Sequence, residues 1–209
     1  MSVISLNMER WMHRKITEDV SGNGIAGATL EIGAGTLNHL QYEPNTDPYD
    51  IVEPVSDLYE SSTLIERIRN IYQDISEIPL YKKYERIISI ATFEHICNLP
   101  EVVAKVGLLL DSVGQLRVAI PSEGTILWTL GWKLTTGIEF RLRYGLDYGV
   151  LMKHEHINNA KEIDEILEYF FASIKRRVLG INKTLSFYRF IVCTIPHVKR
   201  CSDYLETIT

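Results

Sequence analysis

The chain has 209 residues, of which 45% are hydrophobic and 23% charged, a composition typical of a globular protein with one domain. A formal net charge of −5 argues against a nucleic-acid substrate, because phosphate contacts require a positively charged surface. The three cysteines are odd in number and lack metal-ligand spacing, so we expect reduced thiols in a cytoplasmic protein. We expect no signal peptide and no membrane-spanning helix, since charged residues interrupt every apolar run.

Residues 4–16 carry apolar side chains at helical spacing, which predicts an amphipathic helix. Two interpretations are open for this helix. It packs on the edge of the domain, or it forms a lid over a bound cofactor, with His13 or Arg14 near the ligand.

An apolar stretch beginning at Ala26 ends in an acid and two glycines, Glu31, Gly33 and Gly35. This order predicts a strand that enters a tight turn at a helix start, where backbone N–H groups face a ligand and a Cβ would intrude. A dinucleotide fingerprint requires Gly or Ala where this chain has Asn38, and the chain lacks the Gly-Lys-Ser/Thr run of a phosphate loop.

Polar residues follow each of the next apolar segments. Glu53 ends a short strand twenty positions after Gly33, the distance at which nucleotide-binding α/β folds place a ribose-binding acid. Asp74 follows a third apolar segment. A fourth strand from residue 84 leads into residues 92–96, and a fifth covers residues 114–121.

Taken in this order, residues 26–124 resemble class I S-adenosylmethionine-dependent methyltransferases of the small-molecule, type-11-like branch, with Leu37 in place of the third glycine of the first motif. The resemblance implies a Rossmann-like α/β fold: a seven-stranded, mostly parallel sheet with an antiparallel last strand and helices on both faces. It also implies S-adenosylmethionine as the cofactor. The residues implied to bind it are Glu31, Gly33, Gly35, Glu53, Asp74, Ile75, Thr92 and Phe93.

Residues 125–153 interleave aromatic side chains with Lys, Arg and Gly, a pattern that suits neither a core helix nor a strand. In the resembled fold this region carries the acceptor-binding insertion, and aromatic faces with Arg groups suit sugars or phosphate-bearing acceptors. We expect Trp132, Arg143 and Tyr144 to bind the acceptor together with Glu94. The alternatives are a helical hairpin whose aromatics only pack, and a segment that rests on a membrane surface.

Asn159 followed by Glu162 indicates a capped helix start, and two strands are expected over residues 172–179 and 185–194. We therefore expect a single domain, with an N-terminal helix or lid over 1–25, a cofactor-binding half over 26–124, an acceptor-binding insertion over 125–158 and closing elements over 159–209.

Methyl transfer from a sulfonium needs in-line positioning and, for a hydroxyl acceptor, a base. Histidine suits that role near neutral pH, so the candidates are His154 and His156, with His95 as a further one. We expect the nearby helix start to lower the pKa of the imidazole, and Glu155 to orient one ring. The chain shows neither a zinc ligand set nor the acid pair of magnesium-dependent enzymes, so we expect no metal.

Several stretches, among them residues 93–99 and 154–159, look most like methyltransferases of bacterial surface-polysaccharide pathways. This resemblance implies O-methylation of a sugar hydroxyl, with a glycan or other small molecule as the partner. Two alternatives stay open: methylation of a quinone-type or natural-product precursor, and a non-catalytic, cofactor-binding partner subunit. The sequence leaves the oligomeric state open.

Overall fold

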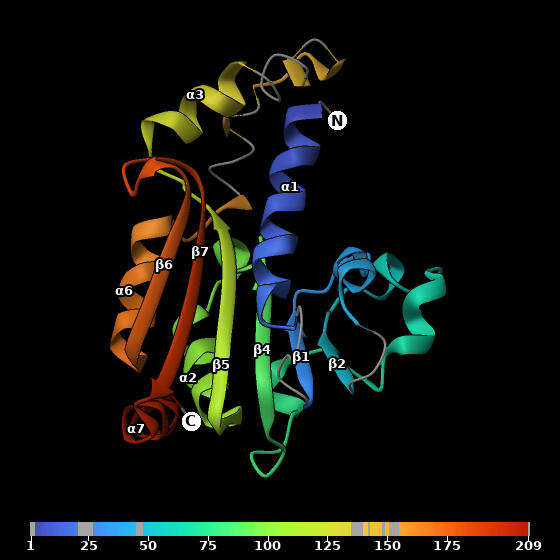
Figure 1. The fold of residues 1–209 in the computed structure, drawn as a ribbon, viewed down its shortest axis with the longest axis vertical. Coiled ribbons are helices and arrows are strands. Elements are labelled where there is room, and N and C mark those ends of the chain that lie inside the picture. Colours follow the sequence, from blue (N-terminus) through green and yellow to red (C-terminus); the bar gives the residue numbers. More distant parts are fainter. Residues whose placement is uncertain are drawn as a thin grey trace.

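The computed structural model describes residues 3–20, 27–44, 48–134, 140–141, 143–147, 149–150 and 155–208; the side chains of residues 3–6, 126, 132 and 134 lie outside that description. Its centre is a seven-stranded sheet in the order β3-β2-β1-β4-β5-β7-β6 (Figure 1). The strands are β1 Thr29–Ile32, β2 Tyr49–Val52, β3 Asn70–Tyr72, β4 Tyr84–Ile90, β5 Leu110–Pro121, β6 Phe171–Asn182 and β7 Leu185–Pro196. The first five are parallel, and β7 runs antiparallel to both β5 and β6. The expected fold class is confirmed.

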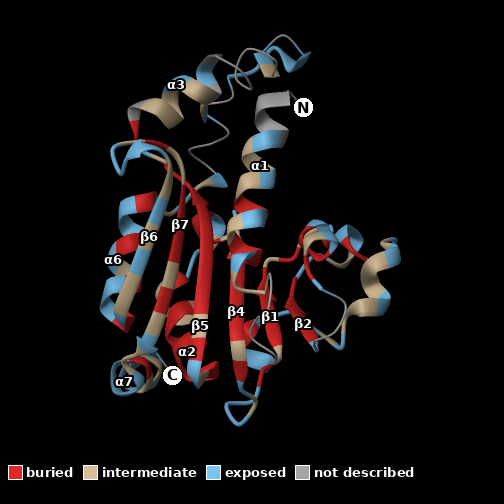
Figure 2. Ribbon diagram, viewed as in Figure 1, coloured by how far each residue is buried: buried red, intermediate tan, exposed pale blue. Residues whose placement is uncertain are grey.

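The central strands are apolar on both sides because helices or turns cover both faces of the sheet. Figure 2 shows β1, β4 and β5 buried almost throughout, whereas β6 at the sheet edge is largely exposed or half-buried. On one face, α2 (Leu99–Leu109), α6 (Ala160–Phe170) and α7 (Val198–Ile208) pack around a core that includes Leu30, Ile87 and Val118.

Two of these helices begin at local start signals, and the start at Asn159 is the one predicted above. Pro100 stands in the first turn of α2, and Asn159 caps α6 with a complete capping box to Glu162. Helix α7 was not predicted. Its apolar face is short, and it closes the core by burying Cys201 beside Gly107 of α2.

The opposite face is covered by α1 (Val3–Ile16), which confirms the expected N-terminal helix (Figure 1). Met12 and Ile16 pack there with Leu37, Ile51 and other residues of a second core cluster. The connections that follow β1, β2 and β3 contain 3₁₀ turns: η2 (Asn38–Tyr42), η3 (Ser56–Leu58), η4 (Thr63–Arg67) and η5 (Ile75–Glu77). A turn of five residues replaces the α-helix expected after the glycines, so that expectation is wrong. With Pro44 and Pro48 close behind, the segment is too short to propagate an α-helix.

Helix α3 (Ile126–Leu134) lies across the amino end of β7, where the Trp128 and Tyr188 rings meet edge to face with centroids 5.4 Å apart. Within the described part of the chain, no helix is both long and apolar enough to cross a membrane.

Candidate active site

The residues predicted to bind the cofactor follow the carboxyl ends of β1, β2, β3 and β4. The strand order reverses between β1 and β4, so the connections that leave these two strands diverge to opposite faces of the sheet. Open α/β sheets bind their ligands at such a switch point. The topology therefore brings the predicted cofactor residues to one edge of the sheet.

The two glycines after β1 differ in what surrounds them. Gly33 has a φ of +74°, and a Cβ at this position would lie 2.2 Å from Cγ2 of Thr92. Gly35 has a φ of +50°, but a Cβ there would meet nothing within 4 Å among the described residues. Gly33 is thus required by packing against the β4 turn, whereas Gly35 leaves open space next to bare backbone, which is where a ligand can approach.

Glu53 is buried and holds the glycine turn from the neighbouring strand. Its Oε2 accepts a hydrogen bond from the Gly35 N–H at 2.8 Å, and its Oε1 accepts one from the Val55 N–H at 3.0 Å. Each carboxylate oxygen can accept a further hydrogen bond. Glu53 therefore orders the turn and keeps the capacity to accept two hydroxyl groups of a ribose.

Glu31 lies within β1, is 2% exposed, and accepts a hydrogen bond from the Tyr49 hydroxyl at 2.8 Å. Burial, partly opposed by that hydrogen bond, raises the pKa of the Glu31 carboxyl to about 8. The side chain therefore faces the core beneath α1, and its described contact is with Tyr49.

At the end of β3, Asp74 is exposed, and its Oδ1 accepts a hydrogen bond from the Ser76 N–H at 2.7 Å. This bond caps η5 and lowers the pKa of Asp74. Ile75 is buried in the core, and so is Phe93 in the turn after β4. Among these three, Asp74 alone offers a polar side chain at the sheet edge.

A second cluster lies after β4 and β5 and contains Glu94, His95, Glu123 and His156. The His156 Nδ1 lies 2.5 Å from Oε1 of Glu123, and the His95 and His156 rings meet edge to face with centroids 4.6 Å apart. The His95 Nδ1 donates to the Glu155 backbone oxygen at 2.8 Å. The structure thus brings His95, His156 and Glu94 together, and adds Glu123, which the sequence did not single out.

The partner of His156 fixes its tautomer. A carboxylate only accepts, so Nδ1 carries the proton and Nε2 of the neutral ring is left as the basic nitrogen. Burial lowers the pKa of His156, but the hydrogen bond and charge of Glu123 outweigh it, and the pKa is raised above its ordinary value. The expectations that a helix start would lower this pKa and that Glu155 would orient the ring by its carboxylate are wrong, because the Glu123 carboxylate takes that place.

The loop that carries His156 is tied to the turn after β4. The backbone N–H groups of Ile157 and Asn158 donate to the backbone oxygen of Glu94. The side-chain amide of Asn158 donates to the backbone oxygens of Phe93 and Ile96. These bonds fix His156 relative to β4. His154 lies outside the described residues.

The expected acceptor residues of the insertion are less connected to this cluster. Arg143 stacks over the ring of Tyr144 at 5.5 Å, and both side chains are exposed. Trp132 lies in α3, with its side chain outside the description. The described contacts of Arg143 and Tyr144 do not join them to His156 or Glu94.

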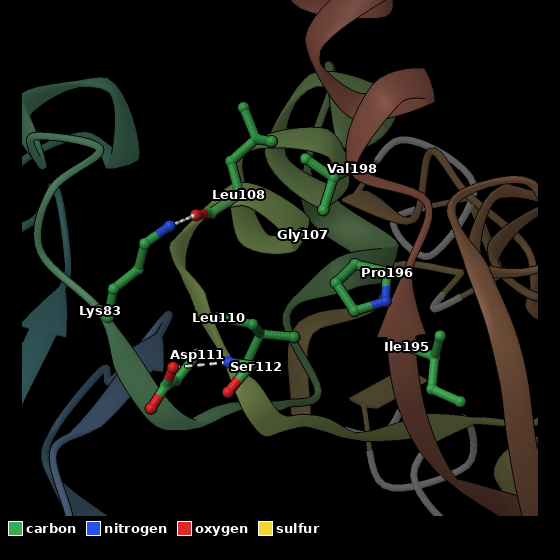
Figure 3. Close-up of a pocket in the computed structure, with 9 residues that line it drawn as sticks. All are labelled: Lys83, Gly107, Leu108, Leu110, Asp111, Ser112, Ile195, Pro196 and Val198. Carbon is green, nitrogen blue, oxygen red and sulfur yellow. Dashed lines mark hydrogen bonds between the residues drawn. The ribbon is translucent and has the colours of Figure 1, made fainter.

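The pocket in Figure 3, of about 260 Å³, lies at the amino end of β4 and β5, opposite the predicted site. Its polar groups already have partners: Lys83 donates to the Leu108 oxygen, and Asp111 accepts from the Ser112 N–H. In the described ranges, no three or more His, Cys, Asp or Glu side chains are arranged so that they could hold a metal ion.

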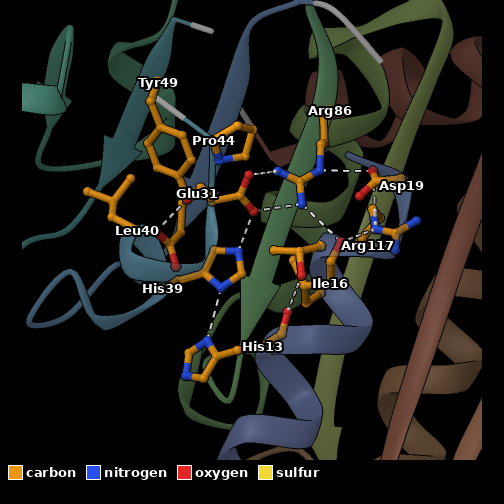
Figure 4. A network of polar contacts seen from close by, with 12 residues as sticks. His13, Ile16, Asp19, Glu31, His39, Leu40, Pro44, Tyr49, Arg86 and Arg117 are labelled. Carbon is orange, nitrogen blue, oxygen red and sulfur yellow. Dashed lines mark hydrogen bonds and ion pairs between the residues drawn. The ribbon is translucent and has the colours of Figure 1, made fainter. Parts of the chain in front are cut away.

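Helix α1 is fixed to the sheet by a buried polar network (Figure 4). Arg86 of β4 donates to Glu43, Asp19 and the Ile16 oxygen, all at 2.8–2.9 Å. His13 of α1 lies 2.9 Å from His39, whose Nε2 donates to Glu43 at 2.6 Å. His13 is 6% exposed and thus part of this network. The interpretation of α1 as a lid over the cofactor, with His13 or Arg14 near the ligand, stays a prediction.

No protein-family model matches this chain, and the search of curated proteins found no match. Solved structures do resemble it. A possible histamine N-methyltransferase from Thermotoga maritima is 15% identical over 90% of this chain and 92% of its own, with a TM-score of 0.61. The plantazolicin methyltransferase BpumL, in complex with SAH, is 11% identical over 91% of this chain and 89% of its own, with a TM-score of 0.63. The N-methyltransferase NodS from Bradyrhizobium japonicum, in complex with S-adenosyl-L-homocysteine, is 13% identical over 91% of this chain and 88% of its own, with a TM-score of 0.62. This chain has the Rossmann-like fold of the S-adenosylmethionine-dependent methyltransferases.

Proposed function

We propose that this protein is an enzyme that transfers a methyl group from S-adenosylmethionine to a small-molecule acceptor. The observation that carries the proposal is the turn after β1, where open space at Gly35 adjoins a buried carboxylate, Glu53, at the switch point of the sheet. This arrangement fits a nucleoside ligand: the ribose hydroxyls would donate to Glu53, and the turn backbone would face the sulfonium end. The solved structures of this fold that contain the demethylated product support the same assignment.

The bound cofactor supplies a methyl group on a sulfonium, which is a good leaving group. The chain must therefore orient the acceptor, exclude water and remove one proton. We assign the proton transfer to Nε2 of His156, because Glu123 holds the proton on Nδ1 and stabilises the imidazolium that forms. His95, packed against this ring, is a positioning residue in this account.

For the acceptor atom we propose a hydroxyl oxygen of a sugar, in bacterial surface-polysaccharide synthesis. A base within the cluster supports an acceptor that must lose a proton, and a hydroxyl meets that condition. The exposed aromatic and arginine side chains of residues 140–144 support a sugar, because flat rings and guanidinium groups pack against its faces. The proposal rests on these features and on the sequence resemblance.

The test is methyl transfer from isotope-labelled S-adenosylmethionine to a panel of oligosaccharides, with the product analysed by mass spectrometry and NMR. The proposal predicts a methyl ether on a sugar oxygen, formed equally well after treatment with a chelator. A methyl group found on carbon or nitrogen would contradict the hydroxyl assignment. Cofactor binding without transfer to any member of the panel would favour a partner subunit instead.

A further inference from the structure

The second cluster contains a carboxylate that the proposed mechanism does not use. Glu94 lies in the turn η6 (Phe93–His95) and is 2% exposed. Its backbone is fixed by the hydrogen bonds from Ile157 and Asn158, so the carboxyl cannot move away with its loop. Its Oε2 finds no hydrogen-bond partner among the residues that the structure describes.

A buried oxygen of this kind is costly, since burying a polar group without a hydrogen-bond partner disfavours the folded state, and more so when the group is charged. Burial, the largest cause, raises the pKa of Glu94 to about 7. The carboxyl is therefore poised between its neutral and ionised forms, and a cation placed next to it would favour the ionised form.

The charges around Glu94 decide which ligand fits. Among the described residues, two charged groups act on it electrostatically: His156, which favours the ionised form, and Glu123, which opposes it. When His156 is protonated, Glu123 neutralises it, and Glu94 remains as the excess negative charge of the cluster. An acceptor that presents a phosphate or a carboxylate here would meet uncompensated carboxylates, whereas an ammonium would be stabilised.

We propose that the acceptor carries an ammonium group, which pairs with Oε2 of Glu94, next to the hydroxyl that His156 deprotonates. This inference rests on the proposed function and narrows its substrate class to amino alcohols, of which amino sugars are the cyclic form. The ammonium gives Glu94 the missing donor, and Glu94 orients the neighbouring hydroxyl toward Nε2 of His156. Glu94 is thus a specificity residue, whereas His156 carries the proton.

The experiment uses three probes of similar size and different charge: 2-aminoethanol, ethane-1,2-diol and glycolate. The full chain is labelled with ¹³C at glutamate side-chain carboxyls, and the Glu94 resonance is assigned with Glu94→Gln and, as a charge-retaining variant, Glu94→Asp. The pH titration of that resonance is then followed with each probe. Glu165→Gln is the matched control, because Glu165 is an exposed glutamate of α6 that forms an ion pair with Lys161.

We expect 2-aminoethanol to lower the pKa of Glu94 by about 1–3 pH units at saturation, the effect of a close opposite charge. The diol and glycolate should leave it unchanged, and Glu165→Gln should respond like the parent chain. The inference is overturned if the amine has no effect, or if all three probes act alike.

A second measurement distinguishes failure of the ammonium site from failure of the methyltransferase assignment. Binding of S-adenosylhomocysteine is measured on the same sample by calorimetry. A chain that binds the product but whose Glu94 ignores the amine refutes the ammonium site alone. A chain whose Glu94 responds to the amine but that fails to bind the product refutes the methyltransferase assignment and leaves the ammonium site in place.

Discussion

Replacing each of the two glycines of the turn after β1 by alanine should have different effects on thermal stability and on affinity for the cofactor product. In Gly33→Ala, the new Cβ lies 2.2–2.8 Å from three atoms of the Thr92 side chain, at a φ of +74°. The left-handed backbone costs about 1–2 kcal/mol and the overpacking about 1–3 kcal/mol. The sum, roughly 2–5 kcal/mol, corresponds to a loss of about 4–20 °C in Tm for a chain of this size. In Gly35→Ala only the cost of the left-handed backbone applies, so the Tm should fall by about 2–8 °C.

Affinity for the cofactor product should show the reverse order. Gly35→Ala places a methyl group in the open space beside the turn, and we expect at least a tenfold weaker Kd, which is about 1.4 kcal/mol. The assays are thermal unfolding and calorimetric titration with S-adenosylhomocysteine. Gly33→Ala combined with Thr92→Ala removes two of the three close atoms and should recover about half of the lost stability. Equal losses of Tm in the two single variants, or full affinity in Gly35→Ala, would refute this division of roles.

Three further predictions concern charged side chains. The rate of methyl transfer should rise with pH through the raised pKa of His156, because the base must be neutral. In Glu123→Gln the midpoint of this pH profile should move to lower pH. In His156→Ala, kcat should fall by about 10²–10⁴. An unchanged pH profile in Glu123→Gln would count against the pair. The raised folded pKa of Glu31 means that its protonated form favours folding, so the free energy of unfolding should fall by up to about 5 kcal/mol as the pH rises from 4.5 to about 8. Glu31→Gln, followed by urea unfolding, should not show this fall. Arg86→Met leaves Glu43 buried without its partner and should cost about 3–5 kcal/mol in the free energy of unfolding; a loss below 1 kcal/mol on the order of a surface pair would show that the network is not structural.

The positions of the first five strands could be predicted because they follow from local signals in sequence, whereas the architecture of the whole sheet came from the resemblance. Most of these five strands are apolar runs next to a glycine, an acid or a proline, and these residues mark where the chain leaves the sheet. Glu53 is an example. Its separation of twenty residues from Gly33 in sequence predicts that both lie at the carboxyl ends of neighbouring strands, and in the structure its Oε2 lies 2.8 Å from the Gly35 nitrogen.

The side-chain partners could not be predicted in the same way, because they depend on packing between segments that are far apart in the chain. Glu123 and His156 are 33 positions apart, so spacing gave no reason to pair them. Arg86 is a buried charged residue within β4, and its partners come from the segment before β1 and the turn after it. Glu155 is next to His156 in sequence, yet its described bond is made by its backbone oxygen to His95.

The most direct test of the central claim is a calorimetric titration of the full chain with S-adenosylhomocysteine, repeated on Glu53→Gln and on Glu60→Gln as an exposed control in the same segment. The account predicts one binding site per chain, an affinity lowered about 10- to 150-fold in Glu53→Gln by loss of charge-assisted hydrogen bonds worth about 1.5–3 kcal/mol, and no change in Glu60→Gln. Absence of binding to the parent chain, or a preference for a nicotinamide dinucleotide, would contradict it.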